Sequence, residues 1–270
     1  MQTEPEFPKL FVFDLDGTAL GGDFEPYRRL PDPFSAFLDR LMARGCHWVI
    51  NSAWEIGGQW RMVRASAVQS RPLYFVGGFA LQLAELVDGD LQKVQPYTAE
   101  MEAEIYKIGR AHLRPIFDDL AARFERTQSD FRLHWLTMRP APEDLARFTE
   151  YAWERYGEDQ HISVYFAEGG TRFSAYPTAM NKGRGMKEIA RRTGLSPDRV
   201  VVAGDAIGDV PMMSPALCAH AICPENAVKR VAAHVRERNG IMGHGVCCLG
   251  VLDAFNRLAQ RHGWDWPTQP

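Results

Sequence analysis

Residues 11–20 of the chain read FVFDLDGTAL. The apolar run at 11–13 is typical of a buried strand, yet two carboxylates, Asp14 and Asp16, stand at its end, followed by a glycine and a threonine. Burying an ionised carboxylate without a partner costs several kcal/mol or more. The rest of the chain must therefore supply a partner for these acids.

The same kind of apolar run recurs along the chain. Its other instances are HWVINSA at 47–53, PLYFVGG at 72–78, RVVVAGD at 199–205 and CAHAIC at 218–223. Continuous rather than alternating hydrophobicity indicates strands that are covered on both faces, as in a parallel sheet. Helical periodicity appears between them, at 32–45 and 183–193. This alternation predicts an α/β fold with a Rossmann-like, doubly wound parallel sheet as its core.

The middle of the chain breaks this rhythm. We expect there a helix over 98–125, a strand at 131–139, a helix over 143–156, and a hairpin whose strands join near Gly169 and Gly170. Helices with antiparallel strands indicate an inserted α+β domain. The predicted boundaries are 1–83 and 179–270 for a discontinuous core, and 84–178 for the insert.

Composition excludes several classes of protein. A formal net charge of −3 and a pI near 6.3 leave no basic field for nucleic acid or anionic lipid. We find neither an apolar run of the ~20 residues that span a bilayer nor a signal-peptide pattern in the first ten residues. Five scattered cysteines form no disulfide framework. We therefore expect a cytoplasmic protein with no membrane partner.

Chemically active side chains follow the predicted strands. In open α/β sheets, ligands bind beyond the carboxyl ends of the strands. Four such ends carry Asp14 and Asp16, then Ser52, then Lys182 in AMNKGRG at 179–185, and last Asp205 and Asp209. Converging carboxylates repel one another, and an all-oxygen acidic site suits Mg²⁺. With a lysine and a hydroxyl beside it, such a site is suited to hold a phosphoryl group and its metal.

The order and spacing of these pieces resemble the haloacid dehalogenase-like (HAD) hydrolase superfamily. Its four motifs are similar to DLDGT at 14–18, Ser52, Lys182 and GDAIGD at 204–209. The insert is similar to the cap of the Cof-type branch (HAD-IIB), which includes many sugar-phosphate phosphatases. FVGGFA at 75–80 and PENAVKRVAAHV at 224–235 also resemble segments of that branch.

The resemblance implies a role for each matching residue. Asp14 would attack phosphorus to give an aspartyl-phosphate, and Asp16 would exchange protons with the leaving group and the attacking water. Ser52 and Lys182 would complete the catalytic set. The implied Mg²⁺ ligands are Asp14, Asp16 (through its backbone carbonyl), Asp205 and Asp209, and the implied substrate-binding residues are Gly17, Thr18, Ser52, Ala53 and Lys182. The expected activity is Mg²⁺-dependent hydrolysis of a phosphomonoester, a small sugar phosphate or similar metabolite.

Three segments of the chain depart from the branch's pattern. Ser52, Ala53 and Trp54 stand where Thr-Gly-Arg is usual, and glycines at 77 and 208 replace asparagines. We interpret Trp54 as a packing residue. Two alternatives stay open: a phosphomutase, and a phosphate-binding regulatory module whose chemistry has decayed.

Overall fold

The computed structural model describes residues 6–23 and 28–267. It contains two compact units. The first combines two separate stretches of the chain, Met1–Tyr97 and Asn181–Pro270, and the second is Thr98–Met180. The chain is therefore a discontinuous domain interrupted by an insertion.

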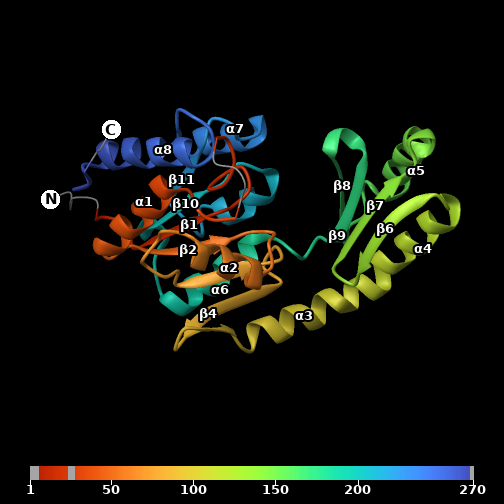
Figure 1. The fold of residues 1–270 in the computed structure, drawn as a ribbon, viewed down its shortest axis with the longest axis horizontal. Coiled ribbons are helices and arrows are strands. Elements are labelled where there is room, and N and C mark those ends of the chain that lie inside the picture. The colour runs from red at the N-terminus through yellow and green to blue at the C-terminus, as the bar shows by residue number, and fades with distance from the viewer. Residues whose placement is uncertain (1–5, 24–27, 268–270) are drawn as a thin grey trace. The chain divides into compact units, whose positions relative to one another are not determined.

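The first unit is built on an eight-stranded sheet (Figure 1). In spatial order its strands are β12 (Ile241–Met242), β11 (His220–Cys223), β10 (Val200–Ala203), β1 (Leu10–Phe13), β2 (His47–Asn51), β3 (Tyr74–Gly77), β4 (Gln82–Val87) and β5 (Asp90–Lys93). The first six strands run parallel, β4 pairs antiparallel with β3, and β5 pairs antiparallel with β4. All four residues of β1 are buried, as its continuous hydrophobicity indicates.

Helices cover both faces of this sheet (Figure 1). They are α1 (Asp32–Ala43), α2 (Ile56–Ala65) and α8 (Cys247–His262) on one face, and α6 (Lys182–Thr193) and α7 (Lys229–Glu237) on the other. Alternate side chains of β1 enter the two cores: Phe11 and Phe13 pack with the first set, and Leu10 and Val12 with the second. The predicted doubly wound α/β core is confirmed.

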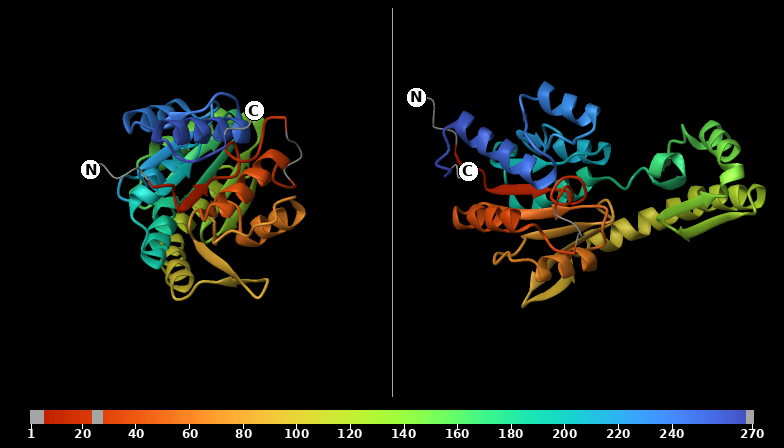
Figure 2. Two further views of the ribbon diagram at one scale, coloured as in Figure 1. Left: turned by 90° about the vertical axis from the view of Figure 1, so that its left-hand side faces the viewer. Right: turned by 45° about the horizontal axis from the view of Figure 1, so that its top comes forward.

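The second unit contains a four-stranded antiparallel sheet. Its strands, in spatial order, are β6 (Thr127–Arg132), β7 (Trp135–Pro140), β9 (Arg172–Pro177) and β8 (Ile162–Ala167). Its helical segments are α3 (Tyr97–Ile108), η1 (Gly109–Leu113), α4 (Arg114–Arg123) and α5 (Leu145–Tyr156). Segments α3, η1 and α4 follow one another without interruption (Figures 1 and 2). Side chains of Leu120, Phe148 and Phe173 are among those that form a separate core. The unit has the α+β character expected of the insert.

The second unit begins at residue 98, whereas the sequence placed the start of the insert at 84. The intervening residues form most of the hairpin of β4 and β5, which extends the large sheet. Ala84 lies opposite Phe75 in antiparallel register, and Leu83 and Ala84 are buried in the core. The change from parallel to antiparallel pairing interrupts the strand–helix rhythm without leaving the first unit.

Two further expectations concern cysteines and membrane spans. All five cysteines are free and buried. Among the helices that the structure describes, none combines the length and the hydropathy needed to cross a bilayer.

Candidate active site

The parallel strands bring four loops to one edge of the sheet. Phe13, the last residue of β1, is in register with Ala203 of β10 and Ile50 of β2, and Asn51 of β2 is in register with Val76 of β3. The residues that follow these strands are therefore neighbours, although they are far apart in the sequence.

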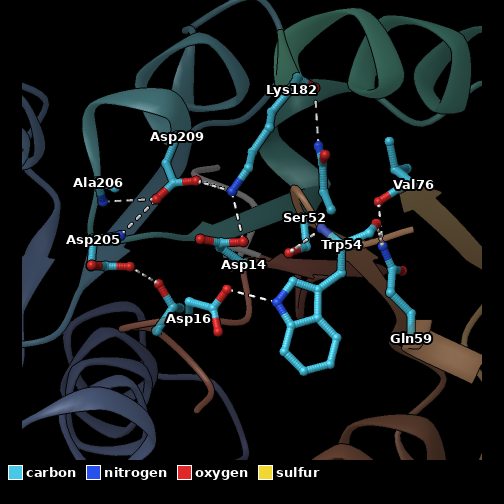
Figure 3. Close-up of polar contacts among 12 residues, drawn as sticks. Asp14, Asp16, Ser52, Trp54, Gln59, Val76, Lys182, Asp205, Ala206 and Asp209 are labelled. Carbon is cyan, nitrogen blue, oxygen red and sulfur yellow. Dashed lines mark hydrogen bonds and ion pairs between the residues drawn. The ribbon is translucent and has the colours of Figure 1, made fainter. Parts of the chain in front are cut away.

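Lys182 lies between two carboxylates at this edge (Figure 3). Its Nζ is 2.7 Å from Oδ1 of Asp14 and 2.5 Å from Oδ1 of Asp209. The lysine is 2% exposed, and its backbone carbonyl accepts a hydrogen bond from the Asn51 side chain. The side chain of Asn181 caps the start of α6 by accepting from the Arg184 backbone N–H. The ammonium group is thus held in one place by its helix and by its two acidic partners.

The loop after β10 orients the other two acids. Asp209 is fully buried, and its Oδ2 accepts the backbone N–H groups of Asp205 and Ala206 at 2.8 and 2.9 Å. Asp205 in turn accepts a hydrogen bond of 2.6 Å from the Thr18 hydroxyl. Thr18 therefore connects the loop after β1 to the loop after β10.

Gly17 is needed for this connection. Its φ angle is +77°, and a Cβ at this position would lie 2.3 Å from Oδ2 of Asp205. Only glycine adopts that backbone conformation readily and also leaves room for the carboxylate. The order Asp-Gly-Thr after β1 thus has a steric reason: the glycine admits Asp205 and the threonine binds it.

Three carboxylates form a cluster that could hold a metal ion. One oxygen from each of Asp14, Asp205 and Asp209 lies within 4.8 Å of the others. Lys182 is the one ammonium group in contact with the cluster among the residues that the structure describes. Three carboxylates beside one cation leave an excess of negative charge, and a hard divalent cation prefers oxygen ligands of this kind. The donor set fits Mg²⁺.

The electrostatics of the cluster agree with this fit. Burial raises the pKa of Asp14 to about 7, an effect that Lys182 opposes and the Asp209 charge increases. Burial also raises the pKa of Asp205 to about 6, against the hydrogen bond from Thr18. Burial disfavours the charged form of Lys182, but Asp14 and Asp209 outweigh it and raise the lysine pKa. The carboxylates are therefore crowded, and a bound cation would favour their ionised forms.

Asp16 and Ser52 lie near this cluster but outside the carboxylate group (Figure 3). Asp16 is exposed, and its Oδ2 accepts a hydrogen bond of 2.7 Å from the Trp54 indole N–H. Ser52 is buried, and its hydroxyl accepts the Trp54 backbone N–H at 3.3 Å. Ala53 is exposed between them.

Several residues that support the site are not evident from the sequence. Trp54 packs against the core as expected, but its contact with Asp16 was not foreseen. Asn226 donates to the Gly17 carbonyl at 2.8 Å and accepts from the Cys247 backbone N–H. Asn226 lies in the segment 224–235, whose resemblance was noted, so a signal for it existed. Neither Asn51 nor Gln59 carries a sequence signal that separates it from an ordinary buried amide.

A family model described as haloacid dehalogenase-like hydrolase matches residues 95–239, which is more than half of the chain. The chain belongs to this family. The resemblance that the motifs indicated is confirmed, and so is the expectation of a hydrolase.

Relatives of known name or structure agree with the family. A protein of Streptococcus pyogenes serotype M6, provisionally named as a phosphatase, is 22% identical over 262 residues, 87% of this chain and 95% of its own length. The fold is similar to that of a sucrose-phosphatase from Synechocystis sp. PCC6803, solved with sucrose and phosphate (TM-score 0.62, 15% identity, 96% of this chain and 99% of that one). It is also similar to a haloacid dehalogenase-like hydrolase from Bacteroides thetaiotaomicron (TM-score 0.62, 14% identity, 95% and 99%). At these identities the two structures support the fold.

The glycine at 77, where the family pattern has asparagine, has a local cause. A Cβ on Gly77 would lie 2.8 Å from the Ile56 backbone nitrogen and 2.9 Å from the Trp54 carbonyl oxygen. Both contacts are with backbone atoms, which cannot move aside as a flexible side chain can. The loop that carries Trp54 therefore approaches β3 too closely for any side chain at 77, and the departures at 54 and 77 belong to one local arrangement.

The glycine at 208 also has a local steric cause, the aromatic ring of Phe79. A Cβ on Gly208 would lie 3.2 Å from Cε1 of Phe79, whose ring is also 5.9 Å from the Lys182 ammonium group. The space that an asparagine side chain would need is thus bordered by the aromatic ring. The glycine at 208 thus leaves room for the Phe79 ring.

We expect Gly208→Asn to destabilise the protein by about 1 kcal/mol, because the new side chain must displace the Phe79 ring. In a Phe79→Ala background the same change should cost clearly less, since the ring is gone. Urea unfolding of the wild type, both single variants and the double variant would measure this coupling. Additive effects of the two substitutions would contradict the steric explanation.

Proposed function

We propose that the protein is a Mg²⁺-dependent phosphomonoester hydrolase that acts through an aspartyl-phosphate on Asp14. The observation that carries the proposal is the contact of one buried lysine with Asp14 inside an acidic cluster. An ammonium group and a divalent cation together would neutralise a phosphoryl group next to the Asp14 carboxylate. Family membership makes hydrolysis the expected reaction.

The chemistry would take place in two displacements. In the first, an Asp14 carboxylate oxygen forms a bond to phosphorus while the bond from phosphorus to the ester oxygen breaks, and Asp16 gives its proton to the leaving alkoxide. In the second, water attacks phosphorus, Asp16 takes a proton from that water, and the bond to Asp14 breaks. Inorganic phosphate leaves, and both carboxyl groups return to their starting states.

The remaining residues would stabilise the charge that develops on the phosphoryl oxygens. Lys182 supplies a fixed positive charge, and the Ser52 hydroxyl and the backbone of Gly17, Thr18 and Ala53 would bind those oxygens. Asp14, Asp205, Asp209 and the Asp16 backbone carbonyl would hold Mg²⁺. The metal, when bound, would act as a Lewis acid that polarises a phosphoryl oxygen.

A small phosphorylated metabolite is the proposed substrate, and a sugar phosphate is the first class to test. The structurally similar Synechocystis enzyme is a sucrose-phosphatase, which supports that choice. The resemblance assigns the role of a specificity domain to the insert expected at 84–178, and we propose this role for the second unit, Thr98–Met180. Free, buried cysteines are in keeping with a protein of the reducing cytoplasm.

Removal of the metal is expected to abolish turnover. Purified protein treated with EDTA should hydrolyse a panel of phosphorylated metabolites and an aryl phosphate at background rates, and added Mg²⁺ should restore the activity. Phosphate release is the measurement. Full activity in EDTA would contradict the metal requirement.

Two other outcomes of the same assay would replace the proposal. Tight binding of a phosphorylated ligand without turnover at saturating Mg²⁺ would indicate a binding module. Isomerisation that depends on a bisphosphate activator and outpaces phosphate release would indicate a phosphomutase.

A further inference from the structure

The Asp16 carboxylate accepts a hydrogen bond from a neighbouring side chain. Among the described residues, the Trp54 indole is the one group that donates a hydrogen bond to its carboxylate, at 2.7 Å (Figure 3). An exposed aspartate without such a partner samples several rotamers. The indole contact therefore selects one orientation of the Asp16 side chain.

Hydrogen bonds hold the Trp54 backbone at both its N–H and its carbonyl group. The Trp54 backbone N–H donates to the Ser52 hydroxyl, and its carbonyl oxygen accepts from the Gly78 backbone N–H at 3.2 Å. That carbonyl also accepts the Gln59 side-chain amide at 2.9 Å.

Gln59 is itself anchored. It lies on α2, is fully buried, and its amide nitrogen also donates to the Val76 carbonyl at 2.8 Å. One amide thus ties the Trp54 loop to β3. The ring packs against the core of the first unit, so both the path of the backbone and the direction of the side chain are determined.

The donor has a useful chemical property for an acid and base. Indole N–H is a neutral group that donates and cannot accept. Oδ2 of Asp16 is therefore the oxygen that accepts in this contact. Oδ1 is the carboxylate oxygen that the indole leaves available for proton exchange.

We infer that Trp54 is a positioning residue: it orients Asp16 for proton transfer to the leaving group. The inference rests on the proposed role of Asp16. Trp54 does not contact the reacting atoms; it acts through the carboxylate that it holds. The residue stands where the family pattern usually has an arginine, and in this chain it supplies a neutral donor.

The inference predicts a dependence on the leaving group. Protonation matters for an ester whose leaving oxygen is a strong base and matters little for one whose leaving oxygen is already stable as an anion. Phenyl phosphate and 2,4-dinitrophenyl phosphate differ in this respect while sharing a ring. The quantity to compare is kcat/KM, because it reports the steps up to the first displacement.

Trp54→Phe keeps the ring and removes the N–H. It is expected to lower kcat/KM for phenyl phosphate by about tenfold or more, and for 2,4-dinitrophenyl phosphate by less than about twofold. The matched control is Trp60→Phe, because Trp60 packs on Phe75 from α2 and has no contact with Asp16. This control should leave both rates unchanged.

A double variant separates positioning from a structural role. In an Asp16→Asn background, Trp54→Phe should have no further effect on phenyl phosphate, because the group that it orients no longer transfers a proton. Equal losses on both esters, no loss on either, or a loss that persists without the Asp16 acid would each overturn the inference. Failure of the proposed function would look different, because the wild type would then hydrolyse neither ester in the presence of Mg²⁺.

Discussion

Asp14→Asn is expected to lower the turnover of a phosphate ester by about four orders of magnitude or more, because it removes the proposed nucleophile. An amide of nearly the same shape remains next to Lys182, from which it can still accept a hydrogen bond. Lys182 also keeps its ion pair with Asp209. The loss should therefore appear in the rate of the chemical step and leave the fold intact.

The measurement is phosphate release at saturating Mg²⁺, accompanied by a thermal melt. Asp90→Asn is a suitable control, since Asp90 is exposed on β5 and the substitution makes the same chemical change. A second readout is the covalent adduct: wild-type protein quenched during turnover should carry a phosphoryl group that the Asp14 variant lacks. Substantial hydrolysis by a well-folded Asp14→Asn variant would rule out the aspartyl-phosphate route.

Much of the fold could be predicted because parallel strands have a distinctive composition. The central residues of strands β1, β2, β3, β10 and β11 are apolar, since helices cover these strands on both faces. β4 is different: it pairs antiparallel at the side of the sheet and is only partly buried, so its hydrophobicity is weaker. For this reason the boundary of the inserted domain was placed at 84, while the structure begins the second unit at 98.

The acidic cluster could be predicted from the chemistry of its residues. The contacts that hold the neighbouring residues in place could not. Carboxylates after strands, together with a distant lysine, point to one shared location, because unpaired buried charge is costly. The contact between Trp54 and Asp16 depends on the path of a loop that is set by Gln59 and by the missing side chain at Gly77. No local propensity encodes such a path. A tryptophan at this position reads as a packing residue until the backbone is known.

The largest effect on stability is expected from Lys182. Lys182→Met retains the aliphatic length of the side chain and removes the charge, which leaves Asp14 and Asp209 buried without a cation. Breaking a buried ion pair from one side costs about 3–5 kcal/mol. We expect a loss of this size in the free energy of unfolding, measured with urea at pH 8 in EDTA. Turnover should fall as well, because the variant lacks the ammonium group that would face the phosphoryl group in the wild type.

Two matched comparisons test whether charge is the cause. Lys187→Met makes the same change on an exposed residue of the same helix and should alter stability little. Mg²⁺ should recover part of the loss in the Lys182 variant, because a ligand that binds only the folded state stabilises it. A large loss in both variants, or no response to Mg²⁺, would contradict an electrostatic origin.

The pH dependence provides the sharpest test of this origin. With Lys182 present, burial already raises the pKa of Asp14 to about 7, well above its value of 3.8 in the unfolded chain. Removing the ammonium group raises the Asp14 pKa further, so near neutral pH the folded variant binds a proton that the unfolded variant does not. Stability must then rise as the pH falls from 8 to 6, since the folded state holds more protons. A defect caused by lost packing would persist at pH 6, because protonation does not refill a cavity, whereas a defect caused by uncompensated charge should shrink there.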